Sequence, residues 1–204
     1  MDFSSVRPEN LSGPERYQLL TSLVVPRPIG WISTRSSDRV PNLAPFSYFA
    51  ALASSPLLVG VSIGLRGGEP KDTLRNIRAV GAFCVNVCSE DLLEAMNVSS
   101  GEYPPGVDEF AVAELTALEG AVVDAPFVGE APAALECELS KEVDLGEAPN
   151  VLIIGEVKTV HLSRSIGFLP ESWAVDPRSL HPVGRLGMDQ YFLPRELKKV
   201  PRPR

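Results

Sequence analysis

Residues 26–34 (PRPIGWIST) and 42–49 (NLAPFSYF) constrain the fold of this chain more than any other part of its sequence. The first segment is rich in β-branched and aromatic residues, and Pro28 stands near its start, where a missing N–H does least harm to a sheet. The intervening residues 36–39 (SSDR) are typical of a turn. We therefore expect a β-hairpin whose returning strand brings amide, hydroxyl and aromatic groups to one place.

Short strands are predicted for much of the remaining chain. Apolar or alternating residues indicate strands at 57–63, 82–88, 122–128, 133–143 and 151–162. In 133–143, Glu136 and Glu138 fall on the face opposite the apolar residues, which is typical of a half-solvated strand. So many short strands with helices between them favour a mainly β protein, a closed antiparallel barrel with helical excursions.

Two helices are expected among these strands. One runs from about residue 72 to 80, capped by Asp72 or Thr73, and the other follows a cap at Ser89. The sequence contains no internal repeat and no linker, so we expect one domain spanning residues 1–204. It begins with a polar extension, 1–20, that contains a short helix or turn, and it ends with a basic tail, 195–204.

Charge and composition exclude several classes of function. The tail carries a net charge of +4, which leaves −11 for the rest of a chain whose total is −7. The negative charge of residues 1–194 does not suit binding to nucleic acid, whose phosphates must be neutralised. The apolar runs are too short to span a membrane. Because Asp2 follows Met1 and no apolar run comes next, we expect no signal peptide and a cytoplasmic protein.

The segment 69–77 (EPKDTLRNI) is a candidate phosphate site. A glycine-rich turn leads to a helix start, where free N–H groups and the helix dipole favour an anion. Lys71 adds a positive charge and Thr73 adds a hydroxyl. The alternative is an ordinary capped helix with a solvent-facing lysine, and the local sequence alone favours that alternative.

The hairpin supplies further candidates. Asn42, Ala44 and Ser47 would let a planar ligand approach the returning strand and hydrogen-bond to it. Trp31 is either a core residue or a cover for a ligand ring. Arg27 lies between two prolines that stiffen it, which slightly favours a specific contact over a solvated side chain.

Other chemistries fit the sequence less well. Cys84 and Cys88 lie four residues apart on a predicted strand, about 13 Å, which is too far for a disulfide. His161 and His181 lack the spacing of zinc ligands. The pair at 108–109 (DE) indicates a turn and helix cap, and no dinucleotide-binding glycine motif is present.

The hairpin and several later motifs together resemble the flavin reductase-like, flavoredoxin-like family of FMN-binding split-barrel proteins. The resemblance covers about 26–191 and includes Lys71-Asp72-Thr73 and the segments 83–87, 96–100, 105–110 and 182–187 with Tyr191. Met188 departs from it, since many relatives have glycine there. It implies an antiparallel Greek-key split β-barrel, a homodimer, and a non-covalent FMN held by Arg27, Trp31, Ser33, Thr34, Asn42, Ala44, Ser47, Lys71, Asp72, Thr73 and Arg185.

The resemblance also implies an oxidoreductase in which the flavin carries the chemistry. NADH or NADPH would visit as a transient donor, and electrons would pass to a small molecule or an electron-transfer protein. One alternative is an FMN carrier without nicotinamide activity. The other is a split-barrel binding module for a haem, an F420-like ligand or no cofactor.

Overall fold

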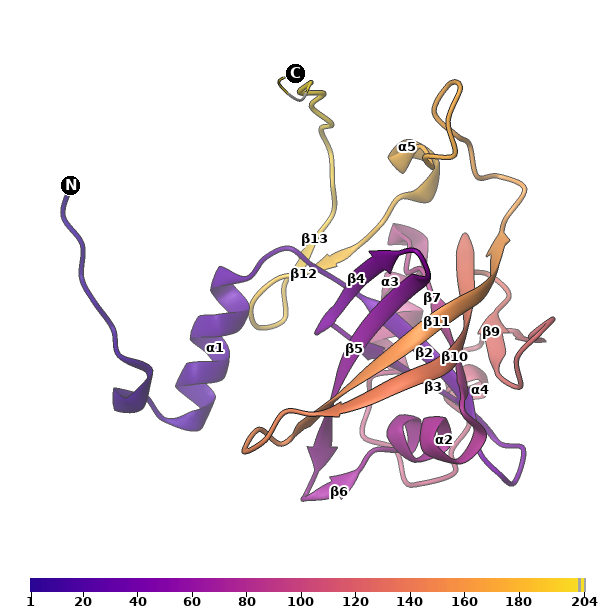
Figure 1. Cartoon of the computed structure of the whole chain (residues 1–204), viewed down its shortest axis with the longest axis horizontal. Coiled ribbons are helices and arrows are strands. Elements are labelled where there is room, and N and C mark those ends of the chain that lie inside the picture. The colour runs from indigo at the N-terminus through magenta and orange to yellow at the C-terminus, as the bar shows by residue number, and fades with distance from the viewer. Residues whose placement is uncertain (202, 204) are drawn as a thin grey trace.

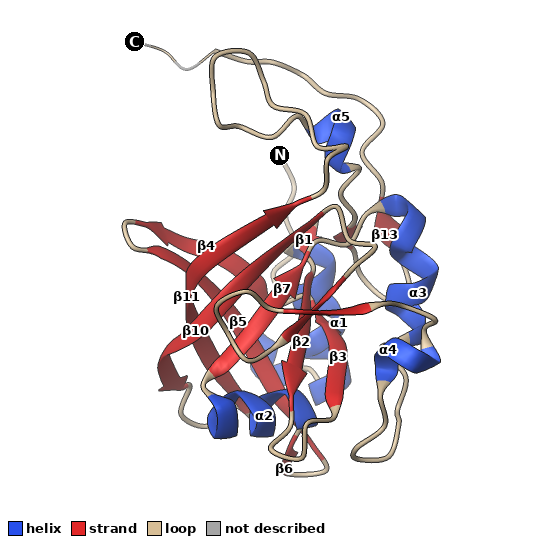
Figure 2. Ribbon diagram, turned by 90° about the vertical axis from the view of Figure 1, so that its right-hand side faces the viewer, coloured by secondary structure: helices blue, strands red, loops and turns tan. Residues whose placement is uncertain are grey.

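The protein is a split β-barrel, seen in a computed structural model that describes residues 1–201 and 203 (Figures 1 and 2). Its eight-stranded antiparallel sheet contains β2 (Gly30–Arg35), β3 (Pro41–Phe46), β4 (Phe49–Ser54), β5 (Leu57–Arg66), β6 (Glu69–Pro70), β7 (Ala82–Asn86), β10 (Ala133–Asp144) and β11 (Asn150–Leu162). Pairing follows the order β3-β2-β7-β10-β11-β5-β4, with β6 beside β5. The end strands β3 and β4 are consecutive in the chain, joined at Ser47 and Tyr48, and the antiparallel split barrel that the family resemblance implied is confirmed.

Two smaller sheets and five α-helices complete the described part of the chain. The small sheets are β1 (Arg27–Pro28) with β12 (Gly184–Arg185) and β13 (Tyr191–Phe192), and β8 (Ala117–Glu119) with β9 (Pro126–Val128). The helices are α1 (Gly13–Leu23), α2 (Asp72–Val80), α3 (Leu93–Val98), α4 (Glu109–Val112) and α5 (Pro177–Leu180), with 3-10 turns η1 (Pro8–Asn10) and η2 (Glu90–Leu92). Figure 2 shows α2 across one end of the barrel and α3 and α4 beside β3.

Strand β2 separates two hydrophobic cores because its side chains alternate between two faces. Ile32 points into the barrel, where the first cluster includes Leu74 and Ile77 of α2. Trp31 points the other way, into a cluster with Met96 of α3 and Phe110 of α4. Burial on both faces explains why all six residues of β2 are buried. The strand therefore fixes α2, α3 and α4 around the neighbouring β3.

Helix boundaries differ in detail from those predicted. Helix α2 spans Asp72–Val80 as expected, but its N-cap is Lys71, which makes no side-chain capping bond. Ser89 makes none either, and η2 separates it from α3. Only residues 126–128 of the predicted strand 122–128 are extended into a ladder. The apolar face of α2 could be predicted because Leu74 and Ile77 keep helical spacing. The caps could not, because they depend on the torsion angles of a few residues.

Glu136 on β10 departs from its predicted solvent-facing position, since its side chain is 0% exposed, whereas Glu138 on the same strand is exposed as predicted. Its carboxylate accepts hydrogen bonds from the backbone N–H groups of Ala121, Val122 and Val123 and contacts Nε2 of His161. These donors offset the cost of burying a charge. Glu136 therefore anchors the loop between β8 and β9 against the barrel.

The two terminal segments extend away from the barrel (Figure 1). Helix α1 begins with a capping box at Ser12 and Glu15, and carries the exposed apolar residues Leu20 and Leu23. The predicted basic tail runs over 195–201 without regular structure, while its residues 202 and 204 lie outside the described part. No described helix combines the length and apolar character needed to cross a membrane.

Candidate functional site

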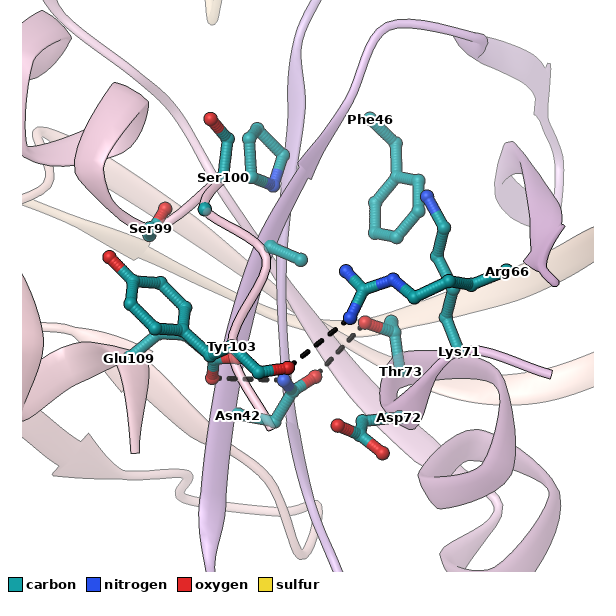
Figure 3. Close-up of a pocket in the computed structure, with 13 residues that line it drawn as sticks. Asn42, Phe46, Arg66, Lys71, Asp72, Thr73, Ser99, Ser100, Tyr103 and Glu109 are labelled. Atoms are coloured by element: carbon teal, nitrogen blue, oxygen red, sulfur yellow. Dashed lines mark hydrogen bonds between the residues drawn. The ribbon is translucent and has the colours of Figure 1, made fainter. Parts of the chain in front are cut away.

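Two adjoining pockets lie along β3 and form the candidate site. The first, called the Lys71 pocket, has a volume of about 80 Å³ and is lined by Asn42, Ala44, Pro45, Phe46, Arg66, Lys71, Asp72, Thr73, Ser99, Ser100, Gly101, Tyr103 and Glu109 (Figure 3). The second, called the Arg185 pocket, has about 190 Å³ and is lined by Ile29, Pro45, Phe46, Ser47, Met96, Ser100, Arg185 and Tyr191. Since Pro45, Phe46 and Ser100 line both, the two pockets form one elongated groove.

The start of α2 gives the Lys71 pocket a positive character. Gly67 and Gly68 adopt positive φ values of 58° and 87°, which only glycine tolerates easily, and turn the chain back toward the helix. No side chain caps the first turn at Lys71, so its N–H groups stay available to an anion. The Lys71 ammonium lies 5.6 Å from the centroid of the Phe46 ring. Burial, together with the nearby Arg66 guanidinium, lowers the pKa of Lys71.

Arg66 and Asp72 complete the rim of this pocket. The Arg66 guanidinium donates to the Tyr103 carbonyl at 3.3 Å, which links β5 to the 101–108 loop (Figure 3). Asp72, predicted as a ligand residue, pairs with Arg75 one turn along α2. Its carboxylate is therefore neutralised within the helix, and Lys71 and Arg66 remain the cations that face the pocket.

Asn42 forms the floor of the Lys71 pocket and joins two elements that are distant in sequence. Its Oδ1 accepts hydrogen bonds from Thr73 at 3.0 Å and from Thr34 at 3.2 Å. Asn76 of α2 in turn donates to the Thr34 hydroxyl at 3.0 Å. Thr34 is buried behind the pocket, so it supports Asn42 and does not face the groove, contrary to its predicted ligand contact.

Glu109 holds the other side of Asn42. Its Oε2 accepts from Nδ2 of Asn42 at 2.9 Å and from the Leu43 N–H at 3.0 Å (Figure 3). Burial raises the pKa of Glu109, with Asp108 adding to the effect, while these hydrogen bonds oppose it. The sequence predicted a turn and helix cap at Asp108 and Glu109. Asp108 is indeed the cap of α4, but no local pattern indicated that Glu109 meets a residue 67 positions away.

The Arg185 pocket combines apolar walls with one cation. The Arg185 guanidinium lies 4.5 Å from the ring centroid of Tyr191 and donates to the Met188 carbonyl. Ile29, Phe46 and Met96 supply the walls, and the Ser47 hydroxyl lies on the rim. The predicted residues Ala44, Ser47 and Arg185 thus line the groove. This half suits a flat, largely apolar group that has polar edges.

Three predicted ligand residues instead support the fold. Arg27 is 5% exposed, and its guanidinium donates to the carbonyls of Thr21, Val24 and Leu186. Trp31 is fully buried with Nε1 donating to Ser99 at 2.9 Å, so the predicted cover for a ligand ring is wrong and the core alternative is right. Ser33 donates to the Pro126 carbonyl at 2.6 Å on the same buried face. Trp31 and Ser33 lie behind the groove because the alternation of β2 directs them there. Arg27 belongs to β1, and its Nε also donates to the Ser47 hydroxyl on the rim of the groove at 3.3 Å.

Metal and thiol chemistry find no support in the described residues. No group of three or more potential ligands there is arranged to hold a metal ion. Cys84, Cys88 and Cys137 are free and buried. Burial raises the pKa of both Cys88 and Cys137 to about 12, so these thiols are not reactive thiolates at neutral pH.

The chain matches known proteins over most of its length. The flavin reductase-like domain matches residues 22–170. An uncharacterized protein of Halalkalibacterium halodurans is 36% identical, covering 97% of this chain and 96% of that protein. Nitrilotriacetate monooxygenase component B from Bacillus cereus has a similar structure, with a TM-score of 0.92, 31% identity and coverage of 98% of this chain and 100% of that one. Flavoredoxin of Desulfovibrio vulgaris gives a TM-score of 0.76 and 25% identity over 87% of this chain and 91% of its own.

Proposed function

The chain belongs to the flavin reductase-like domain family, and from this premise we propose that it binds FMN non-covalently and works as an NAD(P)H-dependent oxidoreductase. The observation that carries the proposal is the Lys71 pocket, where two cations and an uncapped helix start face one small cavity. This combination suits a terminal phosphate group. FMN ends in such a phosphate, whereas in FAD the corresponding phosphate is bonded to a further nucleotide.

The groove as a whole fits the two ends of FMN. Lys71, Arg66 and the first N–H groups of α2 would hold the phosphate, and Asn42 would form the floor beneath it. Ile29, Phe46 and Met96 would pack against the isoalloxazine ring, and Arg185 would favour negative charge at its edge. When bound, the flavin supplies two-electron and one-electron redox chemistry, while the chain binds it, orients it and sets its electrostatic surroundings.

A visiting nicotinamide is the donor that we propose. The sequence has no dinucleotide-binding glycine motif, so the donor would stack transiently on an exposed face of the flavin. Electrons would then pass to a small acceptor or to an electron-transfer protein, in the cytoplasm that the sequence predicts. Anaerobic stopped-flow mixing of the flavin-loaded protein with NADH or NADPH tests this step. Bleaching of the flavin band within seconds is expected.

A flavin carrier without nicotinamide activity is the second candidate. Similarity to a flavoredoxin supports it, since that protein's name denotes a redox carrier. If neither nicotinamide bleaches the flavin while dithionite or a reduced ferredoxin-like donor does, the carrier replaces the reductase. A haem or an F420-like ligand as the sole species released by heat and identified by chromatography would contradict both candidates.

We also propose that the protein is a homodimer, as the family resemblance implies. Exposed apolar side chains on α1 support it, with Leu20 52% and Leu23 72% exposed, and Leu52 on β4 is 46% exposed. Clusters of large exposed apolar residues are typical of surfaces that another chain covers. Light scattering at micromolar concentration should give twice the mass of the chain. A monomer that still holds its flavin would contradict the assembly.

A further inference from the structure

A buried carboxylate lines a pocket that is otherwise built for an anion. Glu109 is 7% exposed, yet it lines the same cavity as Lys71, Arg66 and Thr73. An ionised carboxylate is an acceptor only, and a phosphate dianion is also an acceptor only. Two such groups repel each other in a partly desolvated site unless a proton lies between them.

The hydrogen bonds around Glu109 show which groups already bind it. Oε2 takes the Asn42 side-chain N–H and the Leu43 backbone N–H, both within the floor of the pocket. Both neighbours are donors, so they stabilise an acceptor and supply no proton to an anion. Asn42 is also held from its other side by Thr73 and Thr34, so its amide cannot turn over without breaking those bonds.

We propose that Glu109 makes this site bind a phosphate monoester together with one proton, and so selects phosphate over anions such as sulfate that carry no proton at neutral pH. The inference rests on the proposed function, because it concerns the phosphate end of the FMN site. The proton lies either on Glu109, which then donates to the phosphate, or on the phosphate, which then donates to Glu109. In both arrangements the complex holds one more proton than free FMN and the free site hold together above pH 6.5.

The charges around Glu109 influence whether Glu109 or the phosphate carries this proton. Asp108, adjacent in sequence, disfavours a negative charge on Glu109. The cations Lys71 of α2 and Arg66 of β5 line the same pocket, and Glu102 of the neighbouring loop lies close enough to Lys71 to oppose the lowering of its pKa. Asp72 is paired with Arg75, and the Tyr103 hydroxyl donates to the Val98 carbonyl. Burial raises the pKa of Glu109, which brings it closer to the second pKa of a phosphate monoester, about 6.

The test is the pH dependence of FMN affinity in the full chain, followed by flavin fluorescence. Between pH 6.5 and 8.5 the dissociation constant of FMN should rise by up to about tenfold per pH unit, since each complex takes up one proton. Riboflavin has no phosphate, so its affinity should change little over the same range. Sulfate should displace FMN far less effectively than inorganic phosphate does.

Glu109→Gln is the matched variant. Its amide oxygen can still accept from Asn42 and Leu43, while its amide N–H group can donate to a phosphate dianion. The variant should therefore bind FMN with a flat pH profile, more tightly than the wild type at pH 8.5, and should lose the preference for phosphate over sulfate. Should it fail to fold, the comparison of phosphate with sulfate on the wild-type chain carries the test.

The contradicting outcomes separate the inference from the proposed function. An FMN affinity that is saturable but constant from pH 6.5 to 8.5 overturns the inference alone. So does a slope that persists unchanged in Glu109→Gln, because it then comes from Lys71. A chain that binds no FMN at any pH overturns the proposed function itself.

Discussion

The Thr73 hydroxyl donates its hydrogen bond to Oδ1 of Asn42 at 3.0 Å, and so joins the start of α2 to β3. A hydroxyl has one hydrogen to donate, so this bond competes with any donation to a ligand in the pocket. The positive groups of the Lys71 pocket are therefore Lys71, Arg66 and the backbone N–H groups of α2. Thr73 mainly holds the floor on which they act.

Replacing Lys71 by alanine should weaken FMN binding by about tenfold or more. A charge-assisted hydrogen bond contributes about 1.5–3 kcal/mol, and each 1.4 kcal/mol corresponds to tenfold in affinity. Riboflavin affinity should stay nearly constant because the lost charge faces the phosphate. Lys141→Ala, which removes an exposed lysine of β10, is the matched control. An unchanged FMN affinity in folded Lys71→Ala would favour the ordinary helix start that the local sequence alone suggested.

Thr73→Val should lower stability more clearly than it lowers affinity. The substitution leaves Oδ1 of Asn42 without one of its two donors in a buried network, which costs about 1–3 kcal/mol of unfolding free energy. FMN affinity should fall by less than about tenfold, because the ligand does not depend on this hydroxyl. Thr73→Ser keeps the donor and should stay close to the wild type. Denaturant unfolding and flavin titration measure the two effects, and a loss of affinity as large as that of Lys71→Ala would show a direct contact.

Arg27→Ala should destabilise the protein by about 3 kcal/mol or more. Its buried guanidinium satisfies the carbonyls of Thr21, Val24 and Leu186, which connect the end of α1 with the segment after β12. Removing it leaves these acceptors unpaired, and hydrogen bonds to charged groups contribute about 1.5–3 kcal/mol each. Arg164→Ala, at an exposed position, should change the unfolding free energy by less than about 0.5 kcal/mol. Equal effects of the two substitutions would contradict this structural role of Arg27.

Glu136 should make stability fall with acid. Burial works against its charge, but the hydrogen bonds from His161, Ala121, Val122 and Val123 together hold the pKa of Glu136 below its ordinary value. A lowered folded-state pKa gives stability that is present above the unfolded pKa of about 4.3 and is lost as pH falls through the folded one.

Glu136→Gln tests this dependence. It should be less stable than the wild type at pH 7, and the difference should shrink as the pH falls below about 4. Chemical unfolding at pH 7, 5 and 3 measures it. A difference that is constant with pH would mean that Glu136 contributes through its shape alone.

The sequence predicted the parts of this fold that depend on local pattern and ordered motifs. The alternation of apolar and polar residues predicted β10 and β11, and apolar residues at helical spacing predicted α2. The order of the motifs predicted the split barrel and the flavin reductase-like family. It also placed Lys71, Asn42 and Arg185 beside one groove. These features are local, or they follow directly from the order of strands.

The errors arose where long-range packing decides which way a side chain points. Trp31 and Ser33 lie on a face of β2 that α3 and β9 bury, and no local pattern shows this. Glu136 alternates like a solvent-facing residue but meets a loop that folds over it. Glu109 was missed because its partner Asn42 lies on another element. Buried polar residues of this kind depend on partners distant in sequence.

The central claim is that the groove along β3 holds FMN by its phosphate, and one titration tests it most directly. The full chain is titrated with FMN and, separately, with riboflavin at pH 6.5, with binding followed by flavin fluorescence. We predict saturation at about one FMN per chain, with FMN bound at least about tenfold more tightly than riboflavin, as a charge-assisted phosphate contact requires. Equal affinities for the two flavins, or no saturable binding of FMN, would contradict the claim.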